Sequence, residues 1–175
     1  MISNLRRPIL LSLLVVLVAM VGCRKENEPE DPPAGGGGPV YTPTPFTVAI
    51  PANFSAMPIP SDNPFTLEGI DLGRFLFYEE RLSGNNTQSC ASCHAPAFVF
   101  TDNGQRFSTG IDGVEGNRNS MPMQNLAWEQ RFFWDGRAMT LEEQILEPVT
   151  NPIEMHETWP NAVAKLEADS VYPTL

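Results

Sequence analysis

Hydrophobic and polar positions along this 175-residue chain predict short helices separated by long loops. The first clear pattern follows Thr66, a residue type that favours the N-terminus of a helix. Leu72, Phe75 and Leu76 then recur at spacings of three and four residues, which places them on one helical face. A second helical turn is expected over residues 90–94.

Two further helices are expected in the last third of the chain. The sequence Thr-Leu-Glu-Glu at residues 140–143 has the form of a capping box, so a helix is predicted over residues 141–146, ending before Pro148. Another helix is expected to begin near Thr158. Two of its apolar residues are predicted to face inward, Val163 and Leu166.

The segments between these helices are rich in glycine, proline and asparagine, and no alternating pattern long enough for a β-sheet occurs. Loops are therefore expected at residues 83–87, 101–119 and 147–157. The pattern predicts an all-α fold of few short helices and long loops, which suits a core built partly by a cofactor. Six aromatic residues are candidates to wall such a cofactor, although each alone is more typical of an ordinary core: Phe98, Phe100, Phe107, Phe132, Phe133 and Trp134.

The N-terminal region differs in composition from the rest. Residues 1–22 have the form of a secretory signal peptide, with two arginines before an apolar stretch too short for the roughly 20 residues of a membrane-spanning helix. Met-Val-Gly before Cys23 resembles a bacterial lipobox, which predicts lipidation of this cysteine; an incidental cysteine after an ordinary signal is the alternative. Residues 23–47, with four consecutive glycines, predict a disordered tether, and residues 48–175 form a single predicted domain.

The charge of the chain and its predicted export limit the classes of partner expected for this domain. The chain carries a net charge of −10, and removal of residues 1–22 takes away two arginines and no acidic residue. This acidity excludes nucleic acid as the expected partner. The predicted location is the periplasm, with a lipid on Cys23 anchoring the chain to a bacterial membrane.

The chemistry of the chain centres on Cys-Ala-Ser-Cys-His at residues 90–94. Thiols at i and i+3 of a helical turn reach the two vinyl groups on one edge of a porphyrin, and the next histidine can bind the iron axially. The motif indicates haem c attached to Cys90 and Cys93, with His94 as iron ligand. Two alternatives are a zinc site completed by His156, which needs adjacent ligands to turn inward, and a thioredoxin-like dithiol, which needs a βαβ context.

Further motifs from residue 72 onward resemble the bacterial di-haem cytochrome c peroxidase family, specifically its N-terminal haem domain, a cytochrome c-like fold. Related di-haem oxidases of the methylamine-utilisation type share this scaffold. Phe-Trp-Asp-Gly-Arg at this distance after a haem motif carries the most specific part of the resemblance. The matching segments are residues 72–77, 81–84, 90–94, 100–102, 116–119, 133–138, 141–144 and 151–155.

The resemblance implies a role for several residues. His94 matches the proximal ligand of the peroxide-reacting haem, and Trp134 matches a tryptophan between the two haems on a route for electrons. Gln144 and Glu154 match the distal polar pair, in which Glu154 exchanges protons with peroxide from a loop able to move over the haem. Asn119 matches a residue that helps to bind calcium at the domain interface.

Two departures from the family pattern shape the expected function. Relatives that rest inactive carry a distal histidine in the loop equivalent to residues 108–116, where this chain has Ile111. The distal side of the haem is therefore expected to be open or water-bound without reductive activation. The chain also contains one haem motif and ends at Leu175, so it is interpreted as a fragment that lacks the second haem domain and half of any calcium site.

The leading functional hypothesis is reduction of hydrogen peroxide to water, with electrons from a cytochrome c or cupredoxin arriving through the absent domain. A di-haem oxidase that modifies a protein or organic substrate is the enzymatic alternative. A mono-haem electron carrier with methionine as sixth ligand is the non-enzymatic one. Four methionines are candidates for that ligand, Met121, Met123, Met139 and Met155. A homodimer is a further expectation from the family.

Overall fold

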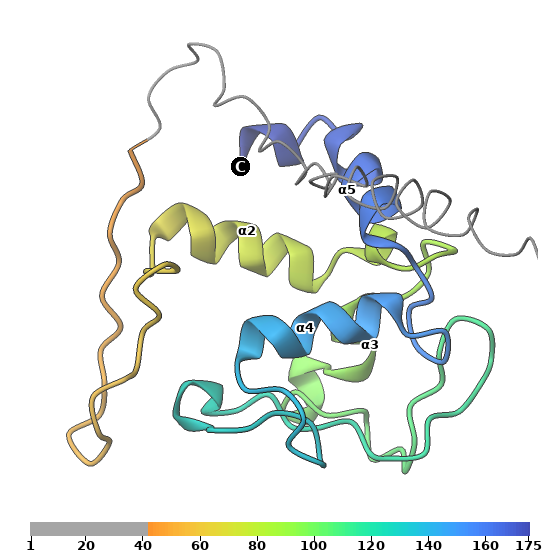
Figure 1. Cartoon of the computed structure of the whole chain (residues 1–175), viewed down its shortest axis with the longest axis horizontal. Coiled ribbons are helices and arrows are strands. Elements are labelled where there is room, and N and C mark those ends of the chain that lie inside the picture. Colours follow the sequence, from red (N-terminus) through yellow and green to blue (C-terminus); the bar gives the residue numbers. More distant parts are fainter. Residues whose placement is uncertain (1–41) are drawn as a thin grey trace, which may run out of the picture. The chain divides into compact units, whose positions relative to one another are not determined.

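The computed structural model describes residues 42–175, and within them helices are linked by long irregular segments (Figure 1). Residues 1–22, Cys23 and most of the expected tether lie outside the described residues. No helix in this part of the chain has the length and apolarity to cross a membrane. The α-helices are α2 (Leu67–Phe77), α3 (Cys90–Cys93), α4 (Leu141–Thr150) and α5 (Trp159–Glu167), and the 3-10 helices are η1 (Glu80–Leu82), η2 (Pro96–Phe98), η3 (Leu126–Trp128) and η4 (Tyr172–Thr174).

The prediction of an all-α fold is confirmed for the described residues, where β-structure is limited to isolated bridges. One bridge joins Ala95 to Thr101 and another joins Phe132 to Ala138. Both bridges close short loops, the first directly after the haem motif. Mostly irregular chain thus follows the short helix that carries the two cysteines (Figure 1).

Helix α2 begins as its sequence predicts. The Thr66 hydroxyl accepts a hydrogen bond from the backbone N–H of Gly69 at 3.0 Å and so satisfies one of the unpaired donors of the first turn. Leu76 packs against the core, whereas Phe75 remains 43% exposed. The apolar stripe of α2 is therefore only partly covered by the described chain.

Helix α4 also begins as predicted, but its predicted end is wrong. Thr140 accepts a hydrogen bond from the N–H of Glu143, as in a capping box, while the Glu143 carboxylate accepts from Met139. The helix continues through Pro148 to Thr150, so the first four residues of the expected loop at 147–157 are helical. The loop that follows supplies donors to the last turn: the N–H of Met155 bonds the Pro148 carbonyl.

Helix α5 begins after Thr158, as expected, although the Thr158 hydroxyl makes no capping hydrogen bond. The prediction that Val163 faces inward is wrong, because this side chain is 46% exposed. Ala162 is fully buried instead, and Leu166 packs against the same core as predicted. Residues 162 and 166 are four apart and share a face, whereas residue 163 lies about 100° further round the helix.

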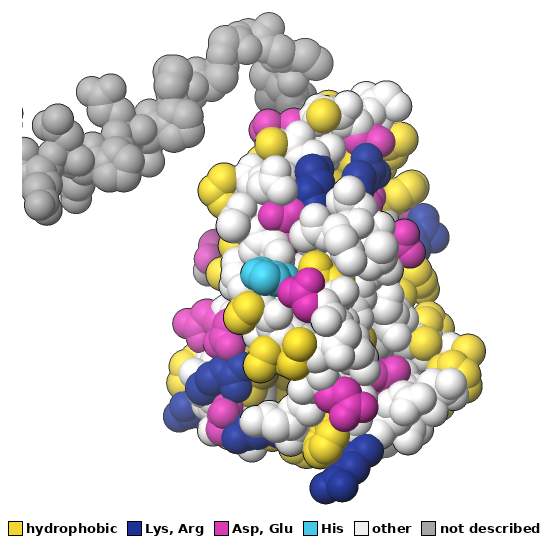
Figure 2. Space-filling model, turned by 90° about the vertical axis from the view of Figure 1, so that its right-hand side faces the viewer, with side chains coloured by type: hydrophobic (Ala, Val, Ile, Leu, Met, Phe, Trp, Pro, Cys, Tyr) yellow, Lys and Arg dark blue, Asp and Glu magenta, His cyan; other side chains and the backbone are white. Residues whose placement is uncertain are grey.

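The hydrophobic core is small for the described part of the chain. It comprises Leu82, Val149, Met155 and Ala162, with Leu76, Trp159 and Leu166 packed against it. Many large apolar side chains lie at the surface instead, and Figure 2 shows them on one face between acidic and basic groups. A chain that leaves so much apolar surface uncovered is suited to a bound cofactor or another domain.

Candidate haem site

Helix α3 is a single turn that carries the two cysteines of the haem motif as its first and last residues. Cys90 and Cys93 are free thiols, each half-buried, and the N–H of His94 closes the turn by bonding the Cys90 carbonyl at 3.0 Å. Burial raises the pKa of both thiols, and nearby Asp102 and Glu154 add to the effect at Cys93. The negative charge of Glu154 therefore acts on the Cys93 thiol of the attachment site.

The imidazole of His94 is oriented through its Nδ1 atom. Nδ1 lies 3.2 Å from Ser120 Oγ and 3.4 Å from the Phe100 carbonyl. Because the Ser120 hydroxyl donates its own proton to the Cys93 carbonyl at 2.9 Å, its lone pairs face the imidazole. Nδ1 therefore carries the hydrogen, and Nε2 is the atom available to a metal. Burial lowers the pKa of His94, which favours the neutral ligand form.

The backbone around this histidine adopts an uncommon conformation. Val99 and Phe100 both have positive φ values, 59° and 57°, which bulky residues seldom adopt. This conformation turns the chain back so that the N–H of Phe100 bonds the Ala95 carbonyl and the Phe100 carbonyl faces His94. Local strain at these two residues is thus part of how the imidazole is held.

The residues present fit haem c. Two thiols at i and i+3 match covalent attachment, and an imidazole with Nδ1 engaged matches axial ligation through Nε2. Of the predicted aromatic wall, Phe98 and Phe100 are 43% and 36% exposed and free to contact a ring, whereas Phe132 is buried in the protein. No group of three or more histidine, cysteine or acidic side chains able to hold a metal ion occurs in residues 42–175, which leaves the zinc alternative without support.

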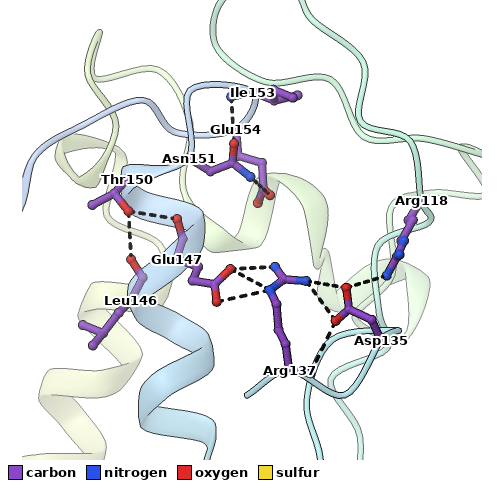
Figure 3. Close-up of polar contacts among 9 residues, drawn as sticks. All are labelled: Arg118, Asp135, Arg137, Leu146, Glu147, Thr150, Asn151, Ile153 and Glu154. Atoms are coloured by element: carbon purple, nitrogen blue, oxygen red, sulfur yellow. Dashed lines mark hydrogen bonds and ion pairs between the residues drawn. The ribbon is translucent and has the colours of Figure 1, made fainter.

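The Glu154 carboxylate is held by a residue that the sequence reading missed. Asn151 Nδ2 donates to Glu154 Oε1 at 2.7 Å (Figure 3). Desolvation by the surrounding chain raises the pKa of Glu154, and the bond from Asn151 and the charge of Arg137 oppose that rise. The Asn-Pro sequence at residues 151–152 is typical of a turn after a helix, and this is the feature of the sequence that could have indicated a structural role for Asn151.

Two loops meet beside Glu154. The N–H of Ile111 donates to the Glu154 carbonyl at 3.0 Å, so the loop that carries Ile111 contacts the Glu154 loop. Gly110 allows this approach, since a Cβ there would lie 1.9 Å from the Ile153 carbonyl oxygen. His156 Nδ1 and Asp112 Oδ2, 2.6 Å apart, join the same two loops.

A chain of charges runs from the Phe-Trp-Asp-Gly-Arg motif to α4. Asp135 bridges Arg118 and Arg137, and Arg137 reaches Glu147 with an N–O distance of 2.6 Å (Figure 3). The Arg137 guanidinium also lies 3.4 Å from the centre of the Phe133 ring. This network fixes the motif against the helix that leads to Asn151.

The remaining predicted site residues fall into two places. Trp134 is 60% exposed, and its indole N–H donates to the Asn119 carbonyl at 2.7 Å, so the structure brings these two together. Gln144 is half-buried on α4, and its side chain makes no hydrogen bond to Glu154 within the described residues. Met155 is 5% exposed in the core and is therefore not available as a sixth iron ligand.

A helical domain with this attachment site defines a c-type haem protein. Residues 67–175 match the family model described as di-haem cytochrome c peroxidase, and the chain belongs to that family. It is 39% identical over 130 residues to the methylamine utilization protein MauG of Methylorubrum extorquens, covering 73% of this chain and 36% of MauG. It is 40% identical over 118 residues to the cytochrome c peroxidase Ccp of Escherichia coli, covering 67% of this chain and 25% of Ccp.

Solved structures agree with these relatives. A MauG-like protein associated with microbial copper homeostasis superposes with a TM-score of 0.68 and 37% identity, over 74% of this chain and 38% of that one. The di-haem peroxidase BthA of Burkholderia thailandensis gives 0.55 and 27%, over 59% and 30%. The chain thus spans about a third of the length of the relatives it matches.

Proposed function

We propose that this chain supplies the peroxide-reacting haem domain of a di-haem enzyme that reduces hydrogen peroxide to water. Membership of the family supports haem peroxidase or oxidase chemistry. The observation that carries the finer proposal is the Glu154 carboxylate, whose Oε1 is bonded to Asn151 while Oε2 has no partner among the described residues. A free carboxylate oxygen, on a group whose charge raises the pKa of the Cys93 thiol, is suited to exchange a proton with substrate.

Glu154 and its neighbours would move protons in this reaction. Reduction of one peroxide molecule consumes two electrons and two protons and gives two water molecules. When bound, haem c supplies the iron that takes up the oxidising equivalents. Glu154 Oε2 accepts a proton from one peroxide oxygen and returns it to the other, so that the second oxygen leaves as water. Gln144 orients the substrate, and Trp134 lies on the route for electrons from the second domain.

The distal side is proposed to be open in the ferric protein. Ile111 has no group able to ligate iron, and the loop that carries it is bonded to the Glu154 loop. The full-length haem-loaded protein should give a high-spin ferric electron paramagnetic resonance signal, and the Ile111→His variant should convert part of it to a low-spin signal. A purely low-spin bis-histidine spectrum of the unmodified protein would contradict this proposal.

The test of the proposed function is peroxide consumption by the full-length protein with a reduced cytochrome c or cupredoxin. Glu154→Gln should slow the reaction with peroxide about 100-fold or more, the usual contribution of a general acid–base residue. Glu129→Gln, a glutamate of another loop, is the matched control and should leave the rate unchanged. An equal rate for Glu154→Gln and its control would refute the assigned role.

A second candidate is a di-haem oxidase that modifies a protein or organic substrate, as the identity to MauG suggests. The exposed Trp134 ring is available to the second domain or to such a substrate, so peroxide turnover has to distinguish the two candidates. Absence of peroxidase turnover in the same assay would support this candidate. The mono-haem carrier ranks lower because Asn151 and Glu154 have no role in it.

The remaining features are proposed from sequence. Lipidation of Cys23 in the periplasm predicts incorporation of labelled palmitate that is lost in Cys23→Ser. A calcium ion at the domain interface is proposed to bind Asn119, whose Nδ2 donates to the Arg106 carbonyl and leaves Oδ1 as the free acceptor. Loss of calcium with a chelator should then change the haem spectrum of the full-length protein. A homodimer would be tested by light scattering.

A further inference from the structure

Asn151 is the C-cap of α4, and its backbone N–H and carbonyl both make hydrogen bonds. Its N–H bonds the Glu147 carbonyl at 2.9 Å, and its own carbonyl accepts from the N–H groups of Glu154 and His156, each at 3.0 Å. The Glu154 loop is thus wound around the backbone of this one residue. The side chain is then left to act on the Glu154 carboxylate.

The side-chain amide of Asn151 can face only one way. Its Oδ1 accepts from the N–H of Ile153 at 3.0 Å (Figure 3). Because a backbone N–H can only donate, the atom facing Ile153 must be oxygen, and the atom facing Glu154 must be the NH₂ group. Asn151 therefore donates to Glu154 Oε1, a bond that is stronger when the carboxylate is ionised.

We propose that Asn151 is a positioning residue for Glu154: it fixes Oε1, favours the ionised carboxylate and leaves Oε2 free to take the substrate proton. This proposal rests on the proposed function of Glu154 as the proton-exchanging group. Asn151 itself touches neither peroxide nor cofactor. It acts by opposing the rise that burial causes in the pKa of the Glu154 carboxyl.

Other charged groups around Glu154 do not replace this bond. Arg137 favours the ionised carboxylate, but it is committed to Asp135 and Glu147. The further ionisable groups of the surrounding helix, turn and loops are Cys93, Asp112, Glu147 and His156. None of these four donates a hydrogen bond to the Glu154 carboxylate within residues 42–175.

Two substitutions separate positioning from simple support of the loop. Asn151→Asp keeps the oxygen that accepts from Ile153 and replaces only the NH₂ group with a second acceptor, which repels Glu154. Asn151→Ala removes both bonds. If Asn151 positions Glu154, the aspartate variant should raise the pKa of Glu154 by about one unit or more, and more than the alanine variant does. If Asn151 only supports the loop, Asn151→Ala should change the pKa of Glu154 more than Asn151→Asp does.

The measurement is an infrared pH titration of the Glu154 carboxyl in the full-length haem-loaded protein, with the band assigned by its loss in Glu154→Gln made in each background. Asn63→Asp is the matched control, because Asn63 Nδ2 donates to Glu142 Oε1 at 3.1 Å in the same manner, in the first turn of α4 rather than at its end. This control should leave the Glu154 midpoint unchanged. The rate of reaction with peroxide should fall as the pH drops through the Glu154 midpoint that the infrared titration gives.

The outcomes separate this proposal from the proposed function. A Glu154 midpoint that rises in Asn151→Asp supports positioning even if peroxide reduction is unaffected, in which case the proposed function fails. A Glu154→Gln variant that reacts slowly while Asn151→Asp leaves the midpoint unchanged overturns the positioning role and keeps the proposed function. A midpoint that moves equally in Asn63→Asp also overturns it, because the effect is then not local.

Discussion

Replacement of Glu157 by glutamine should destabilise the domain in a pH-dependent way. The Glu157 side chain is 5% exposed and forms an ion pair with Lys165, which also donates to the Arg81 and Ser83 carbonyls at 2.9 and 2.8 Å. Although burial disfavours the charge, the bonds from Lys165, Asn161 and the Thr158 N–H hold the pKa of Glu157 at about 2, against an ordinary value of 4.5.

This depressed pKa sets how much Glu157 contributes to the free energy of unfolding and the pH range in which that contribution is lost. A shift from 4.5 to about 2 corresponds to about 3 kcal/mol of free energy of unfolding at neutral pH. Because the native state binds the proton more weakly, the contribution is complete above the unfolded pKa and is lost as the pH falls toward 2. At pH 3 about half of it should remain. Glu157→Gln should therefore cost about 2–3 kcal/mol at pH 7 and roughly 1 kcal/mol at pH 3.

Urea denaturation followed by far-ultraviolet circular dichroism measures this difference. Asp71→Asn is the matched control, because Asp71 pairs with Arg74 on the surface, where side-chain exposures are 56% and 67%. An exposed pair of this kind contributes at most about 0.5 kcal/mol. A cost below about 1 kcal/mol for Glu157→Gln at pH 7, or an equal cost at pH 7 and pH 3, would refute the reasoning.

Two further substitutions test the contacts around the haem motif. Gly110→Ala should force the two loops beside Glu154 apart, because the added Cβ would lie 1.9 Å from the Ile153 carbonyl oxygen; we expect a lower denaturation midpoint and a slower reaction with peroxide. Gly116→Ala is the control in the same loop, because its Cβ would lie no closer than 3.6 Å to the Ser108 carbonyl oxygen, an ordinary contact. Ser120→Ala removes one acceptor from His94 Nδ1, so the histidine becomes a weaker electron donor and the haem midpoint potential should rise in a spectroelectrochemical titration. An unchanged potential would show that the Phe100 carbonyl alone holds the imidazole.

Local signals in the sequence predicted where helices begin, but not always where they end. A threonine cap acts on residues two or three positions away, so Thr66 and Thr140 could be recognised directly. The end of α4 depends on Met155 and Glu157, whose N–H groups bond carbonyls of the last turn after the chain has folded back. Pro148 is tolerated there because the lost hydrogen bond is a single one near the helix terminus.

The candidate site likewise contains residues that the local sequence identifies and residues that only the folded chain brings together. Cys90, Cys93 and His94 are adjacent in sequence, and their chemistry is readable from spacing alone. Ser120 lies 26 residues beyond His94, and nothing in its neighbours indicates that its hydroxyl meets the imidazole. The inward face of α5 was misread at Val163 because amphipathic spacing allows two registers, and only the position of the Leu82–Val149–Met155 core selects between them.

The contacts around Glu154 bear on how its loop can move. The resemblance suggested a loop able to move over the haem, yet the residues after Glu154 are bonded at both ends of the turn. Met155 is buried in the core, and its carbonyl accepts from the N–H of Gly84 at 2.8 Å. Buried Glu157 anchors the far end through Lys165. The exposed Ile153 side chain can move readily, whereas movement of the Glu154 carboxylate breaks its bond to Asn151, and displacement of the backbone as far as Glu157 strains the Glu157–Lys165 pair. Glu157→Gln should therefore loosen the loop as well as the fold, and hydrogen exchange at the amides of residues 154–157 should increase more than exchange in α2.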